Sequence, residues 1–169
     1  KIALPNEKKK GDKPRFQYVL AQLYQINGEK DNARNAYRKV LNMQPSNEMD
    51  FNARLNIAQL EKSPQDAIQL LSKMARLDKH KDQLDQIFGT IGDVYLSHKD
   101  TTNALKYYEK GIEESTQNGH AKAYVLVTAG DIYYKQRNYI KASPCYKEAI
   151  SILSAESEVY QRILQRSET

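Results

Sequence analysis

Four alanines recur along the chain at nearly constant intervals, and they constrain the fold more than any other feature of the sequence. They are Ala33, Ala67, Ala104 and Ala142, with spacings of 34, 37 and 38 residues. A period of this length is typical of helical repeat arrays, in which each unit is a helix–turn–helix and stacked neighbours bury one continuous core. The chain of 169 residues therefore has room for about four such units.

The residues around these alanines share one pattern. A small residue is followed three positions later by Tyr or Ala, then by a turn, the alanine, an apolar or aromatic residue four positions on, and a small or apolar residue. Three units keep the pattern closely: Ala21, Tyr24, Ala33, Tyr37 and Val40; Gly92, Tyr95, Ala104, Tyr108 and Gly111; and Gly130, Tyr133, Ala142, Tyr146 and Ala149. The unit around Ala67 is degenerate, because Leu55 stands where a small residue is usual.

This pattern, with Pro45 closing the first unit, resembles the tetratricopeptide-repeat (TPR) family. The resemblance implies an all-α fold: a right-handed α-α superhelix of about four helix–turn–helix repeats plus a C-terminal capping helix. The expected divisions are a flexible lead-in at 1–13, repeats at 14–47, 48–80 (degenerate), 84–118 and 120–154, and a capping helix or truncated fifth repeat at 155–169.

Local signals predict nine helices with boundaries that suit these repeats. Asn27-Gly28 is expected to end one helix, and N-caps are expected at Ser63, at Asp100 or Thr101, and at Asn138. The glycines at the small position predict a tight helix crossing, since Gly costs roughly 1 kcal/mol relative to Ala inside a helix. Pro144 conflicts with its helix, where it should remove a hydrogen bond.

Charge and composition favour a soluble helical protein over a nucleic-acid binder. Of the formal charge of +5, the first thirteen residues supply 5 − 2 = +3, while elsewhere Lys and Arg alternate with Asp and Glu. A nucleic-acid interface would carry its basic residues as a stripe across the folded part. The lysine run is interpreted as a solvated lead-in, with a basic recognition tail as the alternative. No apolar run is long enough to span a membrane, so direct membrane insertion is not expected.

The sequence carries no enzyme, metal or cofactor motif. Cys145 lies on an apolar helical face and is expected to be a buried thiol rather than a nucleophile. His80, His98 and His120 lie without metal-ligand spacing and are expected to be exposed loop residues. Gly89 to Gly92 lacks the Lys-Ser/Thr of a phosphate loop. The expectation is therefore a protein that binds a protein or peptide, with no cofactor and no catalytic residue.

The TPR resemblance also implies a partner-binding groove, formed by the first helix of each repeat. Its positions fall on Tyr18, Gln22, Gln25, Asn52, Asn56, Gln59, Asp93, Leu96, Tyr124, Val127, Asp131 and Tyr134. Amides and tyrosines of this kind can bind an extended peptide backbone, and the tyrosines are the expected anchors. TPR domains that grip the acidic tails of chaperones use Lys and Asn where this chain has Tyr18, Gln22, Ala53, Gln86 and Thr90, which argues against that ligand.

Asp93 and Asp131 occupy the same position in two repeats and allow two interpretations. They are either groove carboxylates that attract a basic or amide-bearing segment, or ordinary polar residues solvated by water. A repeated polar position can reflect repeat ancestry alone, so the sequence leaves both interpretations open.

A narrower resemblance covers about a quarter of the chain, from Tyr18 to Ala58, and is strongest at Leu20 to Gln25 and Phe51 to Arg54. This segment is similar to TPR segments of Bacteroidota outer-membrane lipoproteins of type IX secretion and gliding motility. It implies a periplasmic scaffold held by an upstream lipid anchor and docked on secretion components. A cytoplasmic peptide-binding adaptor and an accessory domain of an enzyme are the alternatives; partner identity, oligomeric state and total repeat number stay open.

Overall fold

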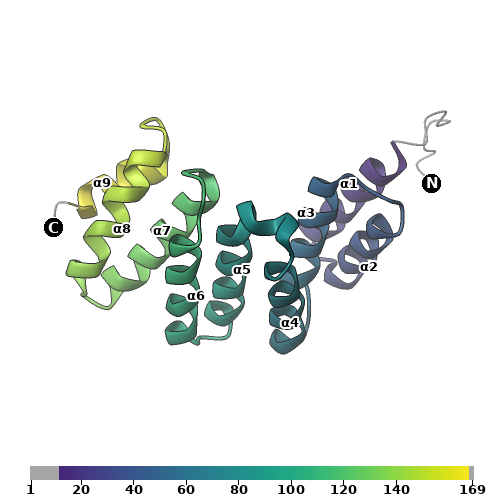
Figure 1. Cartoon of the computed structure of the whole chain (residues 1–169), viewed down its shortest axis with the longest axis horizontal. Helices are drawn as coiled ribbons and strands as arrows, with labels where there is room; N and C mark the ends of the chain where they lie inside the picture. The colour runs from purple at the N-terminus through teal and green to yellow at the C-terminus, as the bar shows by residue number, and fades with distance from the viewer. Residues whose placement is uncertain (1–11, 168–169) are drawn as a thin grey trace. The chain divides into compact units, whose positions relative to one another are not determined.

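The computed structural model describes residues 12–167, and within that range it contains nine α-helices, one 3₁₀ helix and no strand (Figure 1). The elements are α1 (Lys13–Ile26), α2 (Lys30–Leu41), α3 (Asn47–Gln59), α4 (Pro64–Ala75), η1 (Asp78–Gln83), α5 (Leu84–Ser97), α6 (Thr101–Glu113), α7 (His120–Lys135), α8 (Tyr139–Ile152) and α9 (Glu158–Ser167). The all-α fold expected from the sequence is confirmed. None of the described helices is long and apolar enough to cross a membrane.

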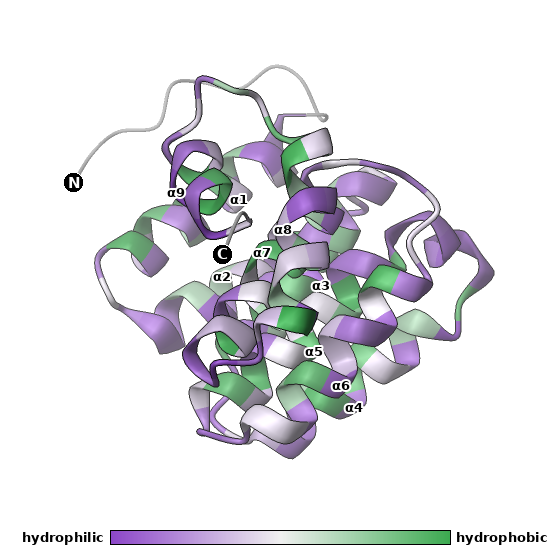
Figure 2. Cartoon of the chain, turned by 90° about the vertical axis from the view of Figure 1, so that its left-hand side faces the viewer, coloured by the Kyte–Doolittle hydropathy of each residue, from purple (hydrophilic) through white to green (hydrophobic). Residues whose placement is uncertain are grey.

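The chain forms two compact units, which divide inside α4, and each is described by itself. Unit 1 ends at Leu70 and contains α1, α2 and α3; unit 2 begins at Leu71 and contains η1 and α5 to α9. Consecutive helices pack as pairs, α1 with α2, α5 with α6 and α7 with α8. Figure 2 shows hydrophobic and hydrophilic residues mixed along the helices, as expected for elements with one buried face.

The repeat alanines and the aromatic residues four positions after them form the cores. In unit 1, Ala33 and Tyr37 are buried against Ala21 and Ile57. In unit 2, Ala104, Tyr108, Ala142 and Tyr146 share one cluster with residues of α7 and with Ile163 of α9. Large rings seated beside small residues are what allow paired helices to approach closely.

The turn between paired helices has the same backbone form in three repeats. One residue has a positive φ each time: Gly28 at 77°, Lys99 at 63° and Arg137 at 59°. The next amide donates back to the helix, as in Glu29 N to Tyr24 O at 2.9 Å. Glycine suits this left-handed backbone, so the predicted helix end at Asn27-Gly28 is confirmed, while the other two turns hold ordinary residues there.

The predicted N-caps are also present. The Ser63 hydroxyl accepts from the Asp66 amide at 3.2 Å, the Asp100 carboxylate from the Asn103 amide at 3.0 Å, and the Asn138 side chain from the Lys141 amide at 3.3 Å. Asp100 rather than Thr101 therefore caps α6. Each bond satisfies an amide that the first turn of a helix leaves without a partner.

Two sequence expectations need correction or completion. His80 was expected to be exposed, but it lies in η1 with only 3% of its surface accessible and its Nδ1 is 3.1 Å from Gln83 Oε1. The short 3₁₀ helix that turns it inward has no strong sequence signal. Helix α8 runs through Pro144, which is exposed. The predicted lead-in, 1–13, lies outside the described residues except for Asp12 and Lys13.

Gly92 and Gly130 lie where a tyrosine ring crosses the helix. A Cβ at Gly92 would be 2.5 Å from Tyr108 Cε1, and one at Gly130 would be 2.7 Å from Tyr146 Cε1. Neither distance is sterically possible without movement of a fully buried ring. The tight crossing predicted from the glycines is thus confirmed, and its partner is the tyrosine of the same repeat.

Replacing Gly92 by alanine should lower the free energy of unfolding by about 1–3 kcal/mol, because the added methyl overpacks the Tyr108 ring. Gly111→Ala is the matched control: Gly111 is also a buried helical residue, but its Cβ would come no closer than 3.3 Å to another atom, Asp85 O, and would need a much smaller shift. Urea unfolding of both variants checks the difference. Equal changes in the free energy of unfolding for the two variants would contradict the prediction, because the effect would then come from helix propensity and not from the contact with the Tyr108 ring.

Candidate functional site

The first cluster in unit 2 is built around Asp93, the residue after Gly92 in α5. Tyr108 of α6 lies across Gly92 and donates its hydroxyl to Asp93 Oδ1 at 2.6 Å. Tyr124 of α7 donates to the same oxygen at 2.9 Å. One carboxylate therefore joins three helices, and we call Asp93, Tyr108 and Tyr124 the Asp93 cluster.

The electrostatics of the Asp93 cluster follow from its partial burial. Desolvation raises the pKa of Asp93 above its ordinary value, and the two tyrosine hydrogen bonds partly oppose this shift. Burial, followed by the charge and hydrogen bond of Asp93, raises the pKa of Tyr124 to about 12. Both tyrosines therefore remain protonated donors at neutral pH, while the carboxylate serves as acceptor.

The second cluster repeats the first, one unit later, around Asp131 in α7. Tyr146 of α8 donates its hydroxyl to Asp131 Oδ1 at 2.7 Å. From α9, Arg162 Nη1 donates to both carboxylate oxygens at 3.0 and 2.8 Å, and Arg166 Nη1 donates to Oδ1 at 2.8 Å. We call Asp131, Tyr146, Arg162 and Arg166 the Asp131 cluster. Charge-assisted bonds of this kind are stronger than neutral ones.

The two clusters have the same sequence spacing. The tyrosine of the paired helix lies 15 residues after the aspartate in both, and Tyr124 and Arg162 each lie 31 residues after it. Helix α9 therefore bonds to Asp131 from the same repeat position from which α7 bonds to Asp93. This places α9 where the first helix of a following repeat belongs, and Ile163 beside Arg162 is fully buried there.

Unit 1 has no carboxylate at this repeat position, where Gln22 stands instead. The Tyr37 hydroxyl donates to Gln25 Oε1 at 2.8 Å, and the Tyr18 ring packs edge-on against it at 5.3 Å. Asn56 Nδ2 of α3 donates to the Tyr18 hydroxyl at 3.1 Å and to the Asn52 carbonyl at 2.8 Å. The polar sides of α1 and α3 thus meet through a network of neutral groups.

The predicted groove residues differ widely in accessibility. Those exposed are Gln22, Gln59 and Tyr124; those partly buried are Tyr18, Gln25, Asn52, Asn56, Asp93, Leu96, Asp131 and Tyr134; and Val127 is buried. The structure brings Tyr18 to Asn56 within unit 1 and Asp93 to Tyr124 within unit 2. Val127, only 9% exposed, belongs to the core cluster, which leaves it little surface for a partner.

Sequence reasoning did not connect the two aspartates with the residues that bond to them. It gives Tyr108 and Tyr146 only as positions of the repeat pattern and Tyr124 only as a groove residue, and it does not single out Arg162 and Arg166. Both carboxylates hold helices of unit 2 together, a role that neither of the two interpretations included. The repeated separation of 15 residues between aspartate and tyrosine is the signal that would have found it.

The potential metal ligands and the single cysteine were candidates for chemistry in the described residues. Within residues 12–167, no three or more His, Cys, Asp or Glu side chains gather as metal ligands. Burial, with a smaller effect of Glu148, raises the pKa of the Cys145 thiol to about 11. A thiol with so high a pKa is almost fully protonated at neutral pH and is a weak nucleophile.

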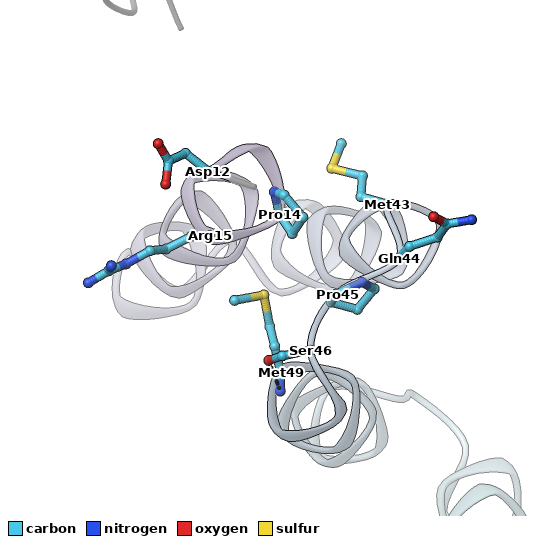
Figure 3. A pocket seen from close by; sticks show the side chains of 8 residues that line it. All are labelled: Asp12, Pro14, Arg15, Met43, Gln44, Pro45, Ser46 and Met49. Carbon is cyan, nitrogen blue, oxygen red and sulfur yellow. Dashed lines mark hydrogen bonds between the residues drawn. The ribbon is translucent and has the colours of Figure 1, made fainter. Parts of the chain in front are cut away.

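An open pocket at one end of unit 1 was not predicted from the sequence (Figure 3). Its lining includes Pro14 and Pro45 together with Met43 and Met49, and Ser46 caps α3 there by accepting from the Met49 amide at 3.3 Å. Figure 3 shows the Arg15 side chain extending away from the other lining residues. The lining mixes polar and apolar side chains, and its two methionines can adapt to irregular shapes.

Comparison with known proteins agrees with this architecture. The family model of the tetratricopeptide repeat matches residues 14–47, 85–118 and 123–152, more than half of the chain. Among solved structures, that of MamA protein is 23% identical with a TM-score of 0.57, covering 94% of this chain and 82% of that one. BtubC from P. vanneervenii is 17% identical with a TM-score of 0.67, covering 94% and 77%.

A tetratricopeptide repeat protein from Parabacteroides merdae is 16% identical with a TM-score of 0.59, covering 94% of this chain and 60% of that one. At these identities the likeness to solved structures concerns the fold alone. A search of curated proteins found no match.

The raised pKa of Asp93 predicts a distinctive pH dependence. Because its folded-state pKa lies above its ordinary value of 3.8, its favourable contribution is fully present below that value and is lost as pH rises through the folded-state pKa. From about pH 7 to pH 4, wild type should therefore gain stability relative to Asp93→Asn. Urea unfolding across this range checks the sign.

Asp31→Asn is the control with the opposite sign. The hydrogen bond from Lys62 is the largest of the effects that lower the pKa of Asp31, so wild type should lose stability relative to this variant as pH falls. Parallel pH profiles for the two variants would contradict the assignment of Asp93 as a desolvated carboxylate.

Cys145 should react slowly with thiol reagents in the folded protein. A pKa of about 11 instead of the ordinary 9.0 lowers the thiolate fraction at pH 8 about 100-fold. The labelling rate with iodoacetamide, compared between native protein and protein in urea, measures this. Native and unfolded rates of similar size would show that the thiol is not shielded.

Proposed function

The chain belongs to the tetratricopeptide-repeat family, and we infer that it is a protein–protein interaction scaffold that holds a partner on the polar surface of α1 and α3. Arrays of this kind present the same helix of successive repeats as an extended binding surface. In unit 1 that surface carries tyrosine and amide side chains. Such groups suit an uncharged, extended segment of a partner protein better than a phosphate or a strongly acidic tail.

One observation carries this proposal: two amides of the surface are exposed and uncommitted. The side chains of Gln22 and Gln59 form no hydrogen bond or ion pair with any residue in the described range 12–167. Their neighbours are bonded: Asn56 of α3 to Tyr18 of α1, and Gln25 of α1 to Tyr37 of α2. A primary amide offers both donors and an acceptor. The two glutamines can therefore each pair with the backbone of an extended peptide, as a strand neighbour would.

The bonded neighbours make the surface rigid before a partner arrives. The Asn56–Tyr18 bond joins α3 to α1, and the edge-on contact of Tyr18 with Tyr37 fixes the ring. A surface that is already ordered loses less entropy on binding, which raises affinity for a given set of contacts. We expect the fixed ring of Tyr18 to contact the apolar side chains of a peptide that bonds to the two glutamines.

Unit 2 offers a second type of contact. Tyr124 is 52% exposed although its hydroxyl bonds to Asp93. The Tyr134 ring lies under the Arg166 guanidinium, 4.9 Å from its centroid. Fixed aromatic rings with one accessible face are frequent anchors at protein interfaces.

The narrower proposal places this scaffold on the periplasmic side of an outer membrane, attached through an upstream lipid anchor and serving type IX secretion or gliding motility. It rests on the resemblance of residues 18–58, and none of the structural or family comparisons supports it. A cytoplasmic adaptor that binds peptides in the same way is the first alternative. An accessory domain of an enzyme is the second.

The double variant Gln22→Ala/Gln59→Ala should bind its partner at least about 10-fold more weakly, since each lost amide removes hydrogen bonds worth roughly 1 kcal/mol. The melting temperature should equal that of wild type, because neither side chain is bonded within the described residues of the folded protein. The measurement is quantitative pull-down from a membrane-solubilised lysate of the source organism, followed by titration of the recovered protein.

Gln69→Ala is the matched control, an exposed glutamine on α4 outside this surface. The proposed surface would be wrong if the double variant still bound the partner as wild type does, or if Gln69→Ala weakened binding as much as the double variant. The identity of the captured protein distinguishes the narrower proposals: envelope secretion or motility components favour the outer-membrane scaffold, and cytoplasmic proteins favour the adaptor.

A further inference from the structure

Helix α1 carries an apolar stripe that no described element covers. Its five members stand at positions i, i+3, i+4, i+7 and i+10, which lie on one helix face, and are between 40% and 80% exposed: Phe16, Val19, Leu20, Leu23 and Ile26. Single exposed apolar residues are ordinary, but a contiguous stripe of this kind marks an interaction surface.

The repeat pattern shows what such a stripe normally contacts. When the repeats are aligned on Ala33, Ala104 and Ala142, three stripe positions correspond to residues of α5 and α7 that are at most 8% exposed. The pairs are Ile87 and Val125 for Phe16, Ile91 and Ala129 for Leu20, and Val94 and Ile132 for Leu23. In α7 this face packs on the preceding pair, α5 and α6. The α1 stripe is therefore the face that rests on a preceding helix pair.

The residue before the stripe has a matching electrostatic role. In the same alignment Arg15 stands where α7 has Tyr124, which bonds to the aspartate of the preceding repeat. In the Asp131 cluster this place is taken by Arg162. The Arg15 guanidinium is exposed and forms no hydrogen bond or ion pair with any residue of the described part of the chain, and Figure 3 shows the side chain extending outward. The dipeptide Arg15-Phe16 thus has the same chemistry and the same repeat position as Arg162-Ile163 of α9.

The two aspartates of unit 2 differ in the length of the helix that bonds to them: α7 has sixteen residues and bonds to Asp93, whereas α9 has ten and bonds to Asp131. The α7–α8 pair carries Asp131, and α9 covers it with ten residues, of which only Ile163 and Ser167 are buried. Helix α1 has fourteen residues and the longer apolar stripe. The surface under α9 therefore fits α1 by charge, by the apolar residue that follows the arginine, and by repeat position.

We propose that α1 of a second copy of this chain can replace α9 on the α7–α8 pair, with Arg15 on Asp131 and Phe16 in the site of Ile163, so that copies join head to tail. The contact joins two different surfaces, so it generates an open chain of copies rather than a closed dimer. Helix α9 is the cap that limits this assembly, because an attached helix competes at a high effective concentration.

Releasing α9 in this chain of 169 residues tests the proposal. Ile163→Asp places a charge in a fully buried apolar site and should detach α9 while Asp131 remains. Light scattering after size exclusion, over a concentration series up to about 500 μM, should show a mass that rises at least about twofold for this variant and not for wild type. Val159→Asp, on the exposed side of α9, is the matched control and should behave as wild type.

Second-site changes in α1 identify the partner surface. Adding Phe16→Asp to Ile163→Asp should return the protein to a monomer, whereas adding Lys13→Glu, at the start of α1 and outside the stripe, should not. Asp131→Arg should release α9 by repulsion yet stay monomeric, because it also repels Arg15. The double variant Asp131→Arg/Arg15→Glu should assemble again, since the charges are exchanged between the two surfaces.

Circular dichroism separates release of α9 from general unfolding, because only the ten residues of α9 should lose helicity. If Ile163→Asp loses more, Arg162→Ala/Arg166→Ala is the milder release and replaces it. A monomer at every concentration after release overturns the proposal. Assembly that persists with Phe16→Asp, or that the charge exchange does not restore, overturns it equally, because the association would then be unspecific.

Discussion

In both repeats of unit 2 that carry an aspartate, the tyrosine of the second helix lies across the first helix at a glycine, whose missing side chain leaves room for the ring. Gly92 and Gly130 provide this space, and the rings of Tyr108 and Tyr146 occupy it fully buried. Each ring then ends with its hydroxyl at the residue after the glycine, which is aspartate in both repeats. One Gly-Asp dipeptide therefore has two consequences. The glycine lets the tyrosine ring come close to the first helix, and this closeness brings the hydroxyl within hydrogen-bond distance of the aspartate.

The same carboxylate determines how the next helix is attached. An aspartate that accepts only one hydroxyl would be partly desolvated and poorly satisfied, which costs free energy. Asp93 receives a second donor from Tyr124, and Asp131 receives two arginines from α9. The donor differs while its place in the repeat is conserved between the two clusters. Stacking of one repeat on the next in unit 2 therefore depends on polar recognition in addition to apolar burial.

Much of the fold followed from residue spacing, because the repeat alanines, the capping residues and the Asn27-Gly28 turn act locally or through a fixed period. The candidate site was harder to predict. The groove positions came from a family resemblance, which says where a side chain lies on its helix but not whether another residue of the chain has already bonded to it. Asp93 and Asp131 illustrate this, since their partners come from helices up to 35 residues away. His80 was mispredicted because a short 3₁₀ helix turned it inward.

The contrast between the units bears on where a partner binds. At the position after the small residue, unit 2 has aspartates whose oxygens are occupied by tyrosine and arginine, whereas unit 1 has Gln22, which is exposed. In unit 1 the Tyr37 hydroxyl instead bonds to Gln25, three residues further on, and this leaves Gln22 uncommitted. The degenerate repeat of unit 1 has Asn56 at this position, and Asn56 bonds to Tyr18 of α1. The position therefore joins helices in three repeats, and only Gln22 is left without a side-chain bond in the described residues. Helical repeats can divide structural and binding roles in this way because each unit has its own local contacts.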